Sequence, residues 1–150
     1  MKTLFRKLSV AVLTLLTIGL AYAGPVNVNA FGVAIDGYDT VAYFTENKAV
    51  RGLERYAVEH DDITWWFASE QNKALFVAAP ERYKPQFAGH CANGLSDGHL
   101  VKGKPEIFRI IDNQLYLFYS WWGKAQWKYD QQEQINLATS NWLHFSSAEQ

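Results

Sequence analysis

The chain has little sulfur, since its 150 residues include one cysteine, Cys91, and one methionine. A single thiol excludes an internal disulfide and puts a four-cysteine metal site out of reach. Neither sign of charge dominates, because the formal net charge is −1, and that balance gives no indication of nucleic-acid binding. A nucleophile triad, a phosphate loop and a glycine-rich nucleotide motif are also missing from the sequence. These absences leave Cys91 as the first residue to examine for function.

The first 23 residues have the layout of a secretory signal. Three cations precede an apolar run over residues 8–20, and residues 21–23 read Ala-Tyr-Ala. The cations are Lys2, Arg6 and Lys7. The run is short for a membrane span, so we expect cleavage after Ala23, export to the bacterial periplasm or medium, and no stable membrane anchor. Residues 24–150 would keep 11 of the 14 basic residues against all 15 acidic ones, which gives a net charge of −4.

Residues 24–150 predict one α+β domain with a twisted, mainly antiparallel sheet built from hairpins, a central helix and a C-terminal helix. Alternating apolar and polar residues interrupted by Asp61-Asp62 and by Asp112-Asn113 indicate two hairpins. Strands are expected at residues 40–44, 53–59, 63–68, 106–111 and 114–120, and helices at residues 69–79 and 121–145. Ser69 is placed to cap the first helix. The second helix carries an apolar stripe formed by Ile135, Ala138, Trp142 and Phe145.

Six tryptophans indicate a large aromatic core and a second kind of site. In a strand, Trp65 and Trp66 point to opposite faces, so one of them faces the core and the other faces solvent, a helix or a partner. An exposed tryptophan, together with Trp122 and Trp127, would form an apolar patch for a small molecule or a protein partner. The alternative is that the C-terminal helix covers this second face.

The segment around Cys91 has features of a soft-metal site. Pro85 and Gly89 indicate a constrained loop, and a short helix beginning after Cys91 would place its thiol at a positive helix terminus. With His90 and His99, the thiolate predicts a site for Cu(I), and less well for zinc. Two alternatives remain open. Cys91 is either a small buried apolar residue, or a redox thiol that requires an external small thiol or partner protein.

Two other groups of residues are weaker candidates. His60 with Asp61 and Asp62 offers ligands for a hard cation, although paired acids at a hairpin turn are usually only solvated. Asp39 is expected to hydrogen-bond its own turn and not to act as an acid or base.

Four segments, in matching order, resemble the exported bacterial YHS-domain proteins. They are residues 37–44, 66–72, 80–92 and 111–117. The resemblance spans nearly all of residues 24–150 and implies the fold of that family. It also implies heavy-metal handling, although other YHS domains usually carry paired cysteines where this chain has one. Members with selenocysteine at the position of Cys91 imply a reactive chalcogen there.

The favoured prediction is therefore a binding module and not an enzyme, which holds copper through Cys91 with help from His90 or His99. Thiol redox chemistry and an aromatic binding surface with a structural Cys91 are the alternatives. No nucleic-acid partner is expected.

Overall fold

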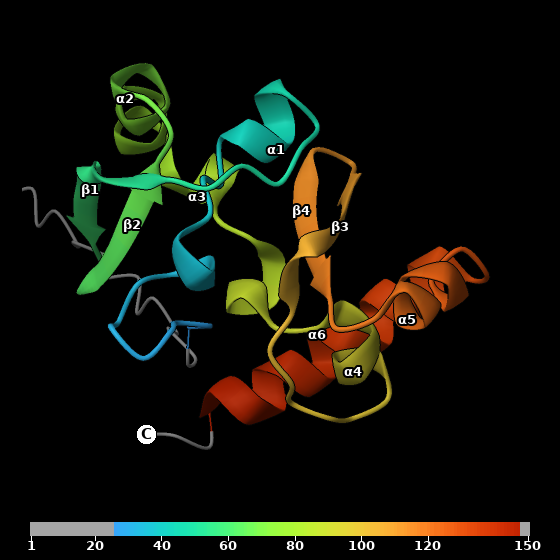
Figure 1. The fold of residues 1–150 in the computed structure, drawn as a ribbon. Coiled ribbons are helices and arrows are strands. Elements are labelled where there is room, and N and C mark those ends of the chain that lie inside the picture. Colours follow the sequence, from blue (N-terminus) through green and yellow to red (C-terminus); the bar gives the residue numbers. More distant parts are fainter. Residues whose placement is uncertain (1–25, 148–150) are drawn as a thin grey trace, which may run out of the picture.

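The computed structural model describes residues 26–147 and has the expected α+β composition (Figure 1). The short elements before the first strand are the 3-10 helix η1 (Ile35–Gly37) and the helix α1 (Ala42–Thr45). Then follow β1 (Leu53–His60), β2 (Ile63–Phe67), α2 (Glu70–Ala78), α3 (Pro80–Tyr83), η2 (Gln86–Gly89) and α4 (Ala92–Ser96). The last elements are β3 (Lys104–Ile111), β4 (Gln114–Phe118), α5 (Trp121–Gln126) and α6 (Gln131–Ser147). No helix within residues 26–147 is long and apolar enough to cross a membrane.

Both predicted hairpins are present and antiparallel. His60 pairs with Ile63 across the first turn, and Ile111 pairs with Gln114 across the second. All four turn residues have positive φ angles, between 49° and 64°, as two-residue turns of this kind require. Aspartate and asparagine tolerate this conformation better than most residues, which explains why both turns were recognisable. The hairpins form two separate two-stranded sheets in the described chain.

The strand predicted at residues 40–44 is wrong, because this segment forms the helix α1. The cause is the carboxylate of Asp39, whose Oδ1 accepts hydrogen bonds from the backbone N–H groups of Val41 at 2.8 Å and Ala42 at 3.2 Å. These donors would otherwise lack partners at the start of a helix. Local capping therefore outweighs the β propensity of the sequence, and the expectation that Asp39 bonds its own turn is confirmed.

The single helix predicted at residues 121–145 is two helices, α5 and α6. The chain leaves the helical path after Trp127, and Asp130 has a φ of 51°, which an α-helix does not allow. Trp127 is fully buried, and its indole N–H donates to Ser96 Oγ at 3.3 Å. By contrast, the helix predicted at residues 69–79 is confirmed as α2, with Ser69 Oγ accepting from Asn72 N.

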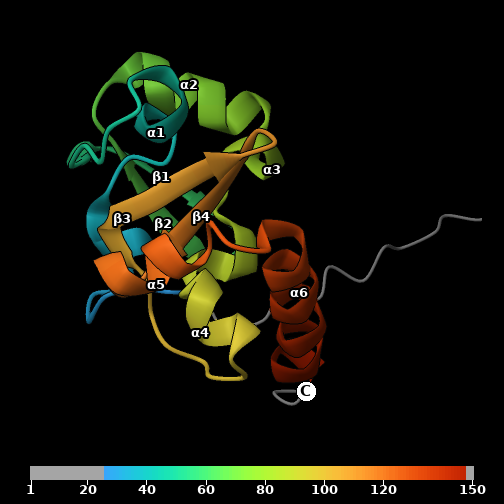
Figure 2. The same ribbon diagram turned by 90° about the vertical axis from the view of Figure 1, so that its right-hand side faces the viewer.

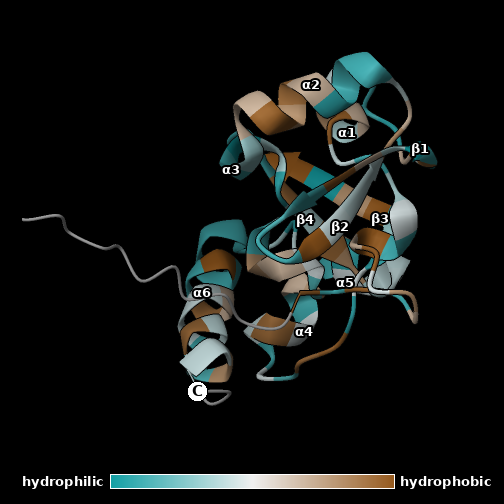
Figure 3. Cartoon of the chain, turned by 90° about the vertical axis from the view of Figure 1, so that its left-hand side faces the viewer, coloured by the Kyte–Doolittle hydropathy of each residue, from teal (hydrophilic) through white to brown (hydrophobic). Residues whose placement is uncertain are grey.

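Two hydrophobic clusters fill the interior, one on each face of β4. Leu115 and Leu117 belong to the first cluster with Trp65 and Phe76, and Tyr116 and Phe118 belong to the second. Helix α2 contacts the β1–β2 hairpin, whereas α4 and α6 pack together at the opposite end of the molecule (Figure 2). Bands of hydrophobic residues recur along α6 (Figure 3). The predicted stripe packs in the second cluster, where Ala138 is fully buried and Ile135, Trp142 and Phe145 are partly buried.

Candidate functional site

Cys91 lies at the start of α4 and is 3% exposed. Its Sγ accepts hydrogen bonds from the backbone N–H groups of Gly94 at 3.3 Å and Tyr119 at 3.2 Å. Its own N–H donates to Val101 O at 2.8 Å, and its backbone bridges Leu117 in β4. The thiol therefore occupies the position of a helix cap and also connects α4 to the end of the second hairpin.

The two predicted histidine ligands lie in different environments. His90 is buried, with Nδ1 3.1 Å from Phe87 O and its ring centroid 5.7 Å from the ring of Trp142. His99 is exposed, and its backbone N–H donates to Gly94 O. In the described chain, Cys91, His90 and His99 do not form a group whose ligand atoms all lie within 4.8 Å of one another. Copper or zinc binding at these residues stays a prediction.

One group of potential metal ligands in the described chain does have all its ligand atoms within 4.8 Å of one another. It consists of His60, Asp61 and Glu81. His60 Nε2 is 3.2 Å from Asp61 Oδ2 and 3.9 Å from Glu81 Oε1. The ammonium of Lys84 lies between the carboxylates, 2.5 Å from Asp61 and 2.7 Å from Glu81. Its hydrogen bond lowers the pKa of Asp61. A lysine thus already supplies the positive charge, so we interpret the group as an ion-pair cluster. Asp62, which the sequence suggested as a ligand, is not in it.

The loop before Cys91 has an unusual backbone. Phe87 and Ala88 have φ angles of 53° and 49°, which non-glycine residues rarely adopt. Gly89 follows with a φ of 83°, and a Cβ there would lie 2.3 Å from Ile35 Cδ1. The Asn27 side chain donates to Gly89 O at 2.9 Å and to Gly103 O at 3.0 Å. The constrained loop expected from Pro85 and Gly89 is therefore present, and its contacts fix the packing of η2 against the N-terminal segment.

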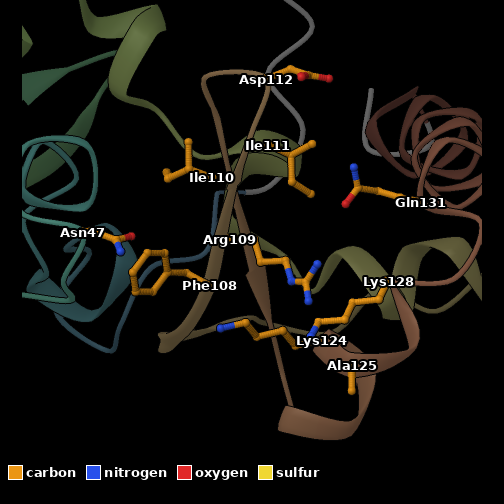
Figure 4. A pocket seen from close by; sticks show the side chains of 10 residues that line it. All are labelled: Asn47, Phe108, Arg109, Ile110, Ile111, Asp112, Lys124, Ala125, Lys128 and Gln131. Atoms are coloured by element: carbon orange, nitrogen blue, oxygen red, sulfur yellow. The ribbon is translucent and has the colours of Figure 1, made fainter.

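A cleft of about 890 Å³ runs along the outer edge of β3 (Figure 4), and we call it the β3-edge cleft. One wall of the cleft is formed by β3 and the turn that follows it, through Phe108, Arg109, Ile110, Ile111 and Asp112. The other wall is formed by Lys124, Ala125, Lys128 and Gln131, and Asn47 lies at one end. Side chains alternate along the strand, with Phe108 and Ile110 on one side and Arg109 and Ile111 on the other.

Three cations, Arg109, Lys124 and Lys128, line this cleft. The charged ends of Arg109 and Lys128 lie near each other in Figure 4, while the ammonium of Lys124 extends toward Phe108, 5.7 Å from its ring centroid. Within residues 26–147, none of them has a carboxylate oxygen within 4.0 Å, and Asp112 is the acidic residue of the lining. Burial first, and then the charges of Arg109 and Lys128, lower the pKa of Lys124. Its ammonium also lies 5.0 Å from the ring centroid of Trp121. The mutual repulsion would be relieved by an anion bound among the three.

Sequence reasoning did not identify these cations. Lys124 and Lys128 are four residues apart, which would place them on one side of the helix predicted at residues 121–145, and that spacing was the available signal. In the structure Lys128 lies in the turn after α5. Arg109 joins them only because α5 contacts β3 in the folded chain. The predicted tryptophan patch requires a correction, because Trp127 is fully buried while Trp122 is 73% exposed.

The prediction that one of Trp65 and Trp66 faces the core is confirmed. Trp65 is 4% exposed and belongs to the core. Trp66 is half-buried, and its side chain packs against Gly37 and Gly52.

The fold and the cleft define a small α+β domain with a basic groove at a strand edge. No family model, curated protein or solved structure matches this chain. The resemblance to YHS-domain proteins, and export through residues 1–23, which lie outside the described residues, therefore stay predictions.

Proposed function

We propose that the chain is a binding module that holds an anionic ligand in the β3-edge cleft, with Cys91 in a structural role. The observation that carries the proposal is that Arg109, Lys124 and Lys128 line one cleft without a carboxylate partner within 4.0 Å in the described residues. Residues 24–150 carry more acidic than basic residues, so a local excess of positive charge is not a consequence of composition. Cations that lack partners and share an open cleft attract anions.

The surroundings of Cys91 support the structural role. Its sulfur is buried and receives two backbone N–H donors, as a serine or aspartate cap would. A thiol in this position satisfies backbone groups of two elements, and it would have to give up those hydrogen bonds to bind a metal or attack a disulfide.

Copper binding and thiol redox chemistry at Cys91 are the competing proposals. For copper, the deciding comparison is a Cu(I) titration of the protein and of Cys91→Ser. Stoichiometric binding that the variant loses would support the copper site, and equal binding by both would remove it. Rapid oxidation of the native thiol by a disulfide such as oxidised glutathione would support the redox alternative.

The anion proposal is tested by titrating ¹⁵N-labelled protein with citrate at low ionic strength. We expect saturable shifts of amide signals at residues 108–112 and 124–131, and weaker binding as salt is added. Arg109→Gln and Lys128→Gln should each weaken binding about fivefold, the effect of losing one charge contact worth about 1 kcal/mol.

Arg55→Gln is the matched control, since Arg55 is exposed on β1 in the other hairpin and its loss changes the net charge equally. An unchanged spectrum with citrate, or equal weakening by Arg55→Gln, would refute the proposed site.

A further inference from the structure

The outer edge of β3 is unpaired in residues 26–147. On one side β3 pairs with β4, and no other strand or isolated bridge contacts it. The outer edge of β4, by contrast, is covered, because Leu115 bridges Pro85 and Leu117 bridges Cys91. The second sheet therefore has one covered edge and one open edge, and the open edge forms one wall of the β3-edge cleft (Figure 4).

The register of the hairpin identifies the backbone groups on this edge. Ile111 and Gln114 flank the two-residue turn, so their N–H and C=O groups bond to each other. Pairing alternates along an antiparallel ladder, so Arg109 also faces β4, whereas Phe108 and Ile110 direct their N–H and C=O groups away from it. In the described chain, neither Phe108 nor Ile110 makes a backbone hydrogen bond outside the hairpin. Their groups are placed to receive another strand.

The charges beside the open edge of β3 determine which kind of strand can pair with it favourably. Arg109 lies on the strand between the two outward-facing residues, and Lys124 and Lys128 form the opposite wall. Lysines beside an open edge discourage pairing with apolar or basic strands, which protects a protein against aggregation. The same charges favour a strand with acidic side chains, because such a strand would place carboxylates next to all three cations.

We infer that the β3-edge cleft accepts an extended acidic segment of a partner protein, which adds to β3 as a further strand. This inference rests on the anion site proposed above and specifies its ligand. Main-chain hydrogen bonds to Phe108 and Ile110 supply the geometry, and the three cations supply the preference for acidic side chains.

The test uses a synthetic peptide of about seven residues, the length of an ordinary strand, that alternates glutamate with valine and has blocked termini. The comparison peptide has the same side chains but N-methyl groups on alternate backbone nitrogens. We expect the first peptide to slow hydrogen exchange of the Phe108 and Ile110 amides about tenfold. The N-methylated peptide should bind at least about fivefold more weakly, because it lacks donors for the ladder.

A variant provides a second measurement. Ile110→Pro removes an N–H that faces away from β4, so the hairpin keeps its own hydrogen bonds while the edge loses a donor. We expect this variant to keep the dispersed amide spectrum of the folded protein and to bind the acidic peptide about fivefold more weakly. Unchanged amide signals of the first hairpin, β1 and β2, report that the variant is folded.

The outcomes separate the two proposals. Equal binding of the normal and N-methylated peptides, without amide protection, would overturn strand addition and leave the anion site intact. Failure of both citrate and the acidic peptide to bind would overturn both proposals. Tight binding of a peptide in which lysine replaces glutamate would also overturn the acidic preference.

Discussion

At the scale of single residues, Asp39 is a buried carboxylate that is hydrogen-bonded through both of its oxygens. Its carboxylate is fully buried and accepts four hydrogen bonds, which hold three segments together. Oδ1 caps α1, while Oδ2 accepts from Ala68 N at 2.8 Å and Asn72 Nδ2 at 2.7 Å. A buried carboxylate of this kind is costly unless its acceptors are used, and here four donors satisfy it.

We predict that Asp39→Ala lowers the free energy of unfolding by at least about 3 kcal/mol, because it leaves several buried N–H donors without an acceptor. Urea denaturation followed by circular dichroism measures the change. The control is Asp36→Asn, which removes the charge of an exposed carboxylate 3.5 Å from Arg51, tolerates the φ of 51° at this position and should cost less than about 1 kcal/mol. Similar losses from the two variants would contradict the assignment of Asp39 as a structural centre.

Cys91 gives a second prediction at this scale. Because Cys91 is 3% exposed, we expect iodoacetamide to alkylate the native protein only as fast as local opening allows, and to react rapidly in urea. Cys91→Ala should lower the free energy of unfolding by about 1–3 kcal/mol, because Gly94 N and Tyr119 N lose their acceptor. Mass spectrometry of timed samples measures the first effect. Rapid native alkylation would show that the thiol is reachable and would favour its chemical use.

At the scale of elements, a hydrogen bond between the side chains of Tyr38 and Glu106 joins the segment after η1 to β3. The Tyr38 hydroxyl donates to Glu106 Oε1, and this hydrogen bond is the main cause of the lowered pKa of Glu106. It also raises the pKa of Tyr38. A carboxyl group with a lowered pKa in the folded state contributes stability above the ordinary glutamate value of 4.5. The contribution disappears as the pH falls through the lower, folded pKa.

We therefore predict that Tyr38→Phe reduces the loss of stability on acidification from pH 5 to about pH 2, because Glu106 then titrates closer to its ordinary pKa. The effect should be small, since Glu106 is mostly exposed to solvent. Thermal unfolding midpoints of both proteins across this range measure it. A steeper acid dependence in Tyr38→Phe would contradict the sign.

Whether an element is stabilised by local or by long-range contacts explains whether the sequence predicted it. Both hairpin turns were recognisable because their aspartate and asparagine residues favour positive φ locally. The segment at residues 40–44 was not, because its helix depends on a carboxylate that α2 also uses through Asn72. The break between α5 and α6 follows the burial of Trp127 against α4, which no local pattern encodes.

The residues of the candidate sites also divide into those that a local sequence pattern predicts and those that only the folded chain brings together. Cys91 was recognised as a residue with a special position, and its place at the start of a short helix was correct. Its burial and its bond to Tyr119 N depend on a contact between residues 28 positions apart. The three cations of the β3-edge cleft likewise come from β3, from α5 and from the turn after α5, so only the packing of α5 on β3 assembles them.

At the scale of the whole molecule, β4 holds the two halves together. Leu115, Tyr116, Leu117 and Phe118 are all buried, and they alternate between the two hydrophobic clusters. A strand in a two-stranded sheet usually has one exposed face, whereas β4 has a core on each side. Loss of either cluster would expose one face of β4 and weaken the packing that orders the other.

We therefore predict a single cooperative unfolding transition for the domain. The indole N–H signals of Trp65 and Trp127 report on the first and second clusters respectively, and their urea midpoints should coincide. Phe76→Leu truncates the first cluster and Leu95→Ala the second, at fully buried positions. Each variant should lower both urea midpoints together. Leu95→Ala should lower the free energy of unfolding by about 2–5 kcal/mol. If either variant lowered only the signal of its own cluster, the halves would be independent folding units and β4 would not couple them.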